Sequence, residues 1–180
     1  VAVVVGALTP LAGQVVQVPA ASAAKNRADR AADVAGIEKL RQQDIAASLS
    51  LDHVALTELW TDDAVRLGPV PPADVGRQAI RESNERLTAN KELKVLSYVP
   101  EYKEMIFLDG GWEVEWRPYT LSFIPSPGGA PVHLRGMVLG VQKKLPDGTW
   151  KGYRGAGSST LRTWRPTNFG ESTSRTNCCR

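Results

Sequence analysis

The sequence has few of the residues that build metal sites and disulfide frameworks. Its two cysteines, Cys178 and Cys179, are adjacent near the end of the chain and cannot join separate parts of a core. Its two histidines, His53 and His133, are far apart and lack the spacing of paired zinc ligands. We therefore expect no disulfide framework, no metal site and no cofactor.

The chain also carries only a small excess of positive over negative charge. The net charge is +3, and residues 162–180 account for all of it, with four arginines against one glutamate. Residues 1–24 carry no charged side chain, so the segment between these two ends is neutral overall. Nucleic-acid-binding proteins concentrate Lys and Arg on one face to displace counterions from phosphates. No such concentration occurs here, and we expect no nucleic-acid partner.

The overall composition is that of a folded protein. The chain has 180 residues, of which 42% are hydrophobic and 23% are charged. These fractions are close to the averages of globular domains and exclude a disordered chain, a collagen or a coiled coil. The length predicts one domain with short extensions.

The amino-terminal segment has the features of an export signal. Residues 1–13 are apolar and uncharged, and the small residues 21–23 precede the first charge at Lys25. Gly, Pro and Gln interrupt the stretch, which falls short of the roughly 20 apolar residues of a spanning helix. We interpret residues 1–24 as a cleaved signal peptide, incomplete at its start because a basic first region is missing. The mature protein is then secreted or periplasmic and free of the membrane.

Three helices are predicted ahead of the main sheet. Apolar residues at three- and four-residue steps indicate an amphipathic helix from Asp33 to about residue 49. Asp52 is a good N-cap for a second, shorter helix, which the cluster 61–63 ends before a brief strand at 64–67. A third helix is expected from Gly76 to about residue 90.

The rest of the chain predicts a curved antiparallel sheet. Glycine-bearing turns separate four long strands, and Pro100 in the first of them marks a bulge or an edge. The glycines after Trp150 weaken the last strand, which is expected to end near residue 155. The fold class is α+β, a cone-shaped sheet wrapped around a long N-terminal helix with an open end that forms a pocket. The expected strands span residues 94–108, 112–124, 132–145 and 149–155. The expected segments of the chain are a linker at 25–34, a domain at 35–157 and a disordered basic tail at 158–180.

Four segments in this order carry a family resemblance. They are Asp52 before the second helix, Leu59–Val65 after it, Gly76–Arg81 opening the third helix, and Pro146–Lys151 at the last hairpin. The chain resembles the nuclear transport factor 2-like superfamily, and within it the SnoaL-like, domain-of-unknown-function-4440 group. The resemblance implies the cone fold and a homodimer formed through the outer face of the sheet.

The family's best-known catalytic machinery does not carry over. In ketosteroid isomerase-like members the base is an aspartate before a proline after the first strand, and here Gly68 precedes Pro69. The positions nearest to that family's oxyanion donors are Asp44 and, on the third meander strand, Met137 or Gly140. Steroid-type isomerase chemistry by those residues is therefore not expected.

Alternation along the strands supplies other candidate residues. On strand 132–145 the odd-numbered face carries His133, Arg135 and Met137, and we expect this face to line the cavity. On strand 112–124 parity does not decide between Glu115 and Trp116. Asp44, on the apolar side of the first helix, is a candidate acid or base with a pKa raised by desolvation. The candidate catalytic residues are thus Asp44, Arg135 and His133, and the candidate ligand-binding residues are Trp60, Tyr102, Glu115, Trp116, Tyr119 and Met137.

Each candidate also has a purely structural interpretation. Asp44 can be a helix-edge aspartate that is paired with Arg41 or Arg135 or hydrogen-bonded to a tyrosine, and aromatic side chains pack in any core. Two functions remain open. One is a small-molecule-binding protein with acid–base isomerase, cyclase or hydrolase-like chemistry on an apolar or cyclic substrate. The other is a non-catalytic ligand-binding or dimerisation module.

Overall fold

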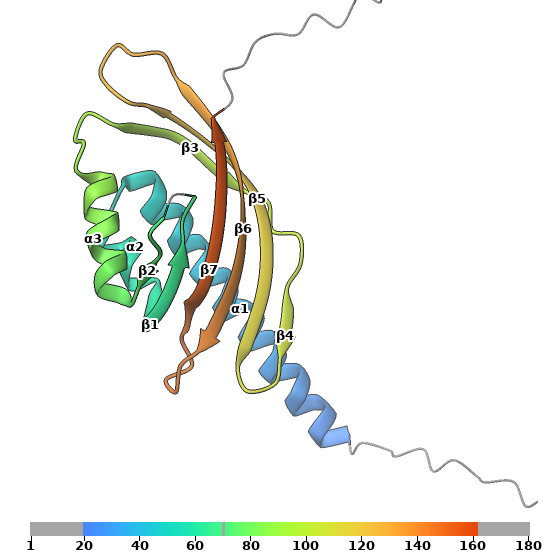
Figure 1. Ribbon diagram of the computed structural model, residues 1–180. Helices are drawn as coiled ribbons and strands as arrows, with labels where there is room; N and C mark the ends of the chain where they lie inside the picture. Colours follow the sequence, from blue (N-terminus) through green and yellow to red (C-terminus); the bar gives the residue numbers. More distant parts are fainter. Residues whose placement is uncertain (1–19, 70, 162–180) are drawn as a thin grey trace, which may run out of the picture. The chain divides into compact units, whose positions relative to one another are not determined.

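The computed structural model describes residues 20–69 and 71–161 (Figure 1). Residues 1–19 of the expected signal peptide and residues 162–180 of the expected tail lie outside this range. The chain divides into two compact units, Val1–Ala35 and Gly36–Arg180. The second unit contains the whole sheet, the second and third helices and the candidate site.

The first helix is longer than the sequence pattern predicts. Helix α1 spans Ala20–Ser50, so the expected linker at 25–34 is helical. The apolar periodicity begins near Asp33, but the alanines before it have high intrinsic helix propensity and extend the helix without an apolar stripe. The residues of α1 from Gly36 onward belong to the second unit.

The two shorter helices form where the sequence places them. Helix α2 spans His53–Glu58, and the Asp52 carboxylate accepts hydrogen bonds from the backbone N–H groups of Val54 and Ala55, both at 3.0 Å. The predicted N-cap is therefore confirmed. Helix α3 spans Arg77–Thr88.

The segment between these helices differs from its prediction. Strand β1 runs from Trp60 to Leu67, so Asp62 and Asp63 lie inside a strand rather than beyond a helix end. The pairing of β1 is irregular between Trp60 and Val65, and this irregularity lets both carboxylates face solvent. A two-residue strand, β2 (Asp74–Val75), pairs with β1.

Seven strands form one mixed sheet within the described residues, in the order β2-β1-β7-β6-β5-β3, with β4 also paired to β5. The long strands are β5 (Trp112–Ile124), β6 (Val132–Lys144) and β7 (Trp150–Leu161). They form the predicted antiparallel meander, whereas β1 runs parallel to β7. The long strands curve, and α2 and α3 lie on their concave side (Figure 1). The α+β cone is therefore confirmed, with a different strand count.

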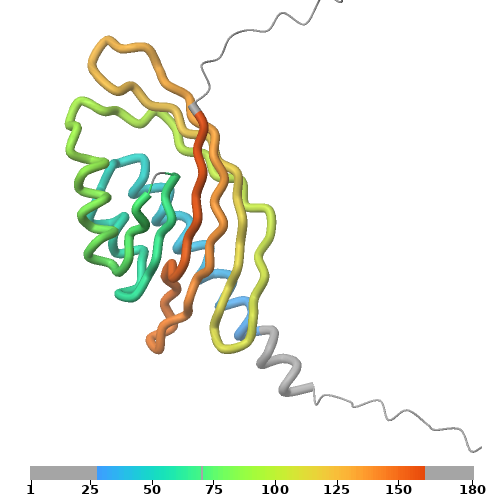
Figure 2. Tube along the Cα trace, viewed as in Figure 1, coloured from blue at the N-terminus to red at the C-terminus, as the bar shows by residue number. Residues whose placement is uncertain are grey.

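The first meander strand is split in two. Strand β3 spans Lys94–Pro100 and β4 spans Ile106–Leu108, and both pair with β5. Residues 101–105 bulge between them and keep two backbone bonds to β5. At the other end of β3, the Asn90 amide donates to the Pro125 carbonyl at 2.9 Å, so the loop after α3 lies beside the β5–β6 turn (Figure 2).

Strand β7 is longer than predicted because its glycines serve packing. A Cβ at Gly155 would lie 2.7 Å from the ring of Trp60, and one at Gly152 would lie 3.0 Å from it. The glycines therefore make room for this indole and do not end the strand. The strand pairs with β6 as far as Leu161.

The inner face of the sheet is only partly filled. The fully buried apolar side chains are few and include Ile37 of α1, Ile80 of α3 and Ala64 of β1. Several buried positions on β5 and β6 are polar or charged instead, namely Glu113, Glu115 and Gln142. The space between α1, α3 and the sheet is therefore a cavity with a polar region.

Candidate functional site

An open cavity of about 850 Å³ lies between the helices and the concave face of the sheet. This volume is within the range of small-molecule sites, about 300–1,000 Å³. Most of the lining is apolar, contributed by helices on one side and strands on the other. The apolar lining residues include Leu40, Leu56, Leu93, Val95, Leu121, Phe123, Leu134 and Val138.

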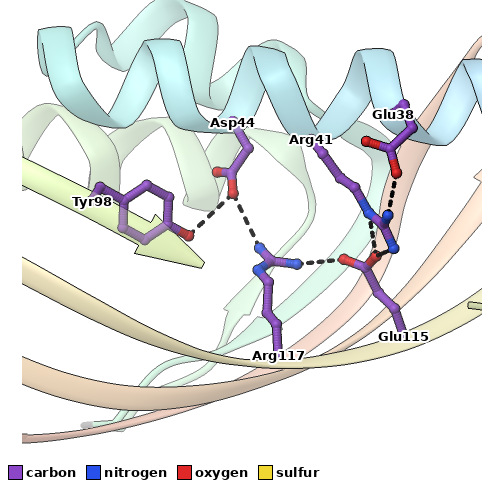
Figure 3. Close-up of polar contacts among 6 residues, drawn as sticks. All are labelled: Glu38, Arg41, Asp44, Tyr98, Glu115 and Arg117. Atoms are coloured by element: carbon purple, nitrogen blue, oxygen red, sulfur yellow. Dashed lines mark hydrogen bonds and ion pairs between the residues drawn. The ribbon is translucent and has the colours of Figure 1, made fainter. Parts of the chain in front are cut away.

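Asp44 is the carboxylate that α1 presents to this cavity, with 21% of its side chain exposed. Its Oδ2 accepts a hydrogen bond from the Tyr98 hydroxyl at 3.2 Å and one from Nη2 of Arg117 at 3.1 Å (Figure 3). Within the part of the chain that the structure describes, no hydrogen bond reaches Oδ1. One oxygen therefore orients the carboxylate and the other is available to a ligand.

Arg117 connects Asp44 to a chain of alternating charges across the sheet and helix (Figure 3). Nη1 of Arg117 lies 2.5 Å from Oε1 of Glu115, and Nη2 of Arg41 lies 2.7 Å from Oε2 of the same glutamate. Arg41 also pairs with Glu38 one turn earlier in α1. Strand β5 and helix α1 thus fix each other's charged side chains. The contact with Glu115 keeps Arg117 in position to pair with Asp44.

Burial shifts the proton affinity of the groups at this end of the cavity. Desolvation raises the pKa of Asp44 above its ordinary value, although Arg117 and Tyr98 act in the opposite direction. Burial also raises the pKa of the Tyr98 hydroxyl, with a further contribution from the Asp44 charge. Tyr98 is therefore a neutral donor, and Asp44 is a stronger base than an exposed aspartate.

Tyr102 covers the arginines of this chain. Its ring centroid lies 4.0 Å from the guanidinium carbon of Arg41 and 5.3 Å from that of Arg117. Both distances are within the range of cation–π attraction. The Tyr102 hydroxyl is buried and has no hydrogen-bond partner within the described residues.

Glu113 is a second buried carboxyl group on β5. Its exposed fraction is 0%, and neither of its oxygens has a hydrogen-bond partner within the described residues. Burial, together with the charge of Glu115, raises the pKa of Glu113 to about 8. A carboxylate without partners is costly to bury, so Glu113 is protonated at neutral pH.

The structure brings five of the nine sequence-derived site residues to the cavity. Asp44 and Glu115 lie at its polar end, and Tyr102 lies beside them. Trp60 and Tyr119 contribute aromatic surface to the wall. Of the two alternatives on β5, Glu115 faces the cavity.

The other four residues lie elsewhere, and the predicted face of β6 is wrong. The even-numbered residues of β6, such as Leu134 and Val138, line the cavity, whereas His133, Arg135 and Met137 are exposed on the opposite face. Trp116 is opposite Leu139 in the β5–β6 register and also belongs to the outer face. Both faces of β6 carry apolar residues, so alternation could not identify the inner one. Pairing of Asp44 with Arg135 does not occur; its arginine partner is Arg117.

Sequence reasoning missed Tyr98 and Arg117 as cavity residues, and it named Arg41 only as a structural partner of Asp44. A signal for Arg117 was present, because Glu113, Glu115 and Arg117 alternate on one face of β5. If Glu115 is assigned to the inner face, the alternation of the strand also places Arg117 on that face, next to Glu115. No local pattern indicates that Tyr98 reaches Asp44, because they are 54 positions apart.

No group of three or more potential metal-ligating side chains occurs among the described residues. Nor is any helix in that range long and apolar enough to cross a membrane.

Comparison with known proteins identifies the fold. No protein-family model and no curated protein matches the chain in sequence. Among solved structures, it is similar to a ketosteroid isomerase-like protein from Erwinia carotovora atroseptica, with a TM-score of 0.60 and 23% identity over 69% of this chain and 94% of that one. An NTF2-like family member from Streptomyces avermitilis matches with a TM-score of 0.59 and 18% identity, covering 72% of this chain and 98% of that one. An NTF2-like protein from Novosphingobium aromaticivorans matches with a TM-score of 0.56 and 17% identity, covering 79% and 90%.

Proposed function

We propose that this chain, which has the nuclear transport factor 2-like fold, binds a small apolar or cyclic molecule in its cavity and performs acid–base chemistry on it. The observation that carries the proposal concerns Asp44. Its carboxylate is the one that α1 presents to a largely apolar cavity, and its Oδ1 accepts no hydrogen bond from the described residues. A cavity filled by side chains would have favoured a module without a ligand. The cavity is open instead.

In this proposal Asp44 is the proton acceptor. A ligand C–H or O–H group would lie against Oδ1, while the donors from Tyr98 and Arg117 hold Oδ2 and fix the plane of the carboxylate. The raised pKa of Asp44 improves it as a base, because the proton affinity of a general base is most useful when it is near the working pH. Arg117 keeps its own proton throughout, since Asp44 and Glu115 stabilise its charge.

The proposal is tested with a panel of cyclic ketones, lactones and epoxides, screened for binding by thermal shift and for turnover by mass spectrometry. We expect the wild type to bind and convert at least one class, and Asp44→Asn to bind it with little or no conversion. Glu38→Gln is the matched control, because Glu38 belongs to the same ion chain but does not line the cavity. Absence of binding across the panel would contradict the proposal.

Binding without chemistry is the second candidate function. It is favoured by the two donors already on Asp44 and by Gly68 and Pro69 at the cavity, where a carboxylate would be needed for the family's familiar mechanism. Equal binding and no conversion by the wild type and Asp44→Asn would select this alternative.

A homodimer through the outer face of the sheet is part of the proposal. Support comes from exposed apolar side chains on that face, including Val99, Ile106, Met137 and Leu139, each between 47% and 51% exposed. Apolar side chains exposed together on one face of a sheet are a feature of interaction surfaces. Export of the mature chain remains a prediction from residues 1–24.

A further inference from the structure

The polar end of the cavity contains four charged side chains whose charges cancel. Arg41 and Arg117 supply two positive charges, and Asp44 and Glu115 supply two negative charges. Each is paired within 3.1 Å, and at most 21% of any of these side chains is exposed. A ligand at this end therefore meets a compensated set of charges.

Three arginines and one aspartate make up the rest of the charged lining, namely Arg66, Arg86, Arg154 and Asp74. Arg66 pairs with Asp74 at 2.8 Å. Arg86 is exposed on α3, where solvent screens it. Arg154 lies opposite Val141 in the β6–β7 register and donates to the carbonyl oxygens of Asp63 and Tyr153.

This arrangement has a direct consequence for ligand charge. A charged group that enters an apolar cavity loses its hydration, and a compensated set of charges offsets that loss less well than an uncompensated opposite charge does. An uncharged ligand pays no such penalty, and a single donor group can use Oδ1 of Asp44.

We infer that the cavity selects uncharged ligands that carry one O–H or N–H donor and that it discriminates against anions of the same shape. The inference rests on the proposed function, since it specifies which molecules the same cavity binds. The compensated ion chain is the element that would produce the selectivity.

The test uses two dyes with one skeleton. N-phenyl-1-naphthylamine is uncharged, and 1-anilinonaphthalene-8-sulfonate adds a sulfonate to the same diarylamine. Fluorescence titration at one fixed pH gives both dissociation constants. We expect the uncharged dye to bind at least about tenfold more tightly to the wild type.

Two variants show whether a dye occupies the cavity. Val138→Phe fills the cavity, whereas Met137→Phe changes the neighbouring residue on the outer face of β6. Binding that is lost in the first variant and kept in the second is cavity binding. If neither dye shows this pattern, the proposed function fails and the inference falls with it.

A charge variant then isolates the electrostatic effect, because the uncharged dye is also the more hydrophobic one. Asp44→Asn leaves the polar end with a surplus positive charge, and we expect the affinity ratio to shift toward the sulfonate by about tenfold. Glu85→Gln makes the same change in net charge at an exposed position of α3 that does not line the cavity, and it should leave the ratio unchanged. If the dyes bind in the cavity but Asp44→Asn leaves their ratio within twofold, charge selection is refuted while the binding function stands.

Discussion

The buried carboxyl group of Glu113 predicts how stability depends on pH. The folded state raises its pKa from 4.5 to about 8, chiefly because the side chain is fully buried without a hydrogen-bond partner within the described residues. Between these two values the folded protein keeps a proton that the unfolded chain has lost. The free energy of unfolding must therefore fall as pH rises through this window.

The size of this effect follows from the shift. Each pH unit within the window costs up to about 1.4 kcal/mol, so Glu113 alone removes about 3 kcal/mol of stability between about pH 5 and 7.5. Glu113→Gln cannot ionise and has a similar volume. We therefore expect the stability of this variant, relative to wild type, to increase by about 3 kcal/mol over the same range.

Urea unfolding at fixed pH values, followed by tryptophan fluorescence, measures this difference directly. Subtraction of the wild-type curve removes the titration of groups that both proteins share, including Asp44. Glu85→Gln, at an exposed position of α3, is the control and should give a flat difference. A difference for Glu113→Gln that stays within about 0.5 kcal/mol across the range would show that Glu113 is ionised in the folded protein.

Five further substitutions test the fold and the assembly. Asp52→Ala should cost about 1 kcal/mol in urea unfolding, because the N-cap of α2 loses both of its backbone contacts. Asn84→Ala should cost about 2–3 kcal/mol by the same measurement, because this buried side chain bridges Arg66 and Thr57. Gly155→Ala should cost about 1–3 kcal/mol from overpacking against Trp60, whereas Gly157→Ala, with no atom nearer than 3.8 Å, should cost less. Leu139→Asp should convert the proposed homodimer into a monomer in light scattering, and an unchanged mass would contradict the proposed interface.

Local signals predicted the turns and caps correctly. Gly110, Gly111, Gly128 and Gly148 all have positive φ values, as the glycine-bearing turns between strands required. Asp52 caps its helix as expected. These features depend on a few neighbouring residues, so the sequence determines them without knowledge of the tertiary structure.

Features that depend on distant residues were not predictable in the same way. The length of β7 depends on Trp60, whose ring occupies the space above Gly152 and Gly155. Viewed alone, those glycines weaken a strand. The site shows the same limit, because Asp44 was found from its place on the helix, whereas its partners Tyr98 and Arg117 come from two strands far along the chain.

Strand β5 shows why alternation misled the assignment of faces. Its charged residues Glu113, Glu115 and Arg117 point inward, where they meet α1 or remain buried, and its apolar residues Val114 and Trp116 belong to the outer face. The usual rule assumes that apolar residues face the core. It fails here because the ion chain compensates the charges of Glu115 and Arg117, so that burying them is tolerated. The same inversion leaves apolar side chains on the outer face of the sheet, and this is the physical reason to expect that a second molecule covers it.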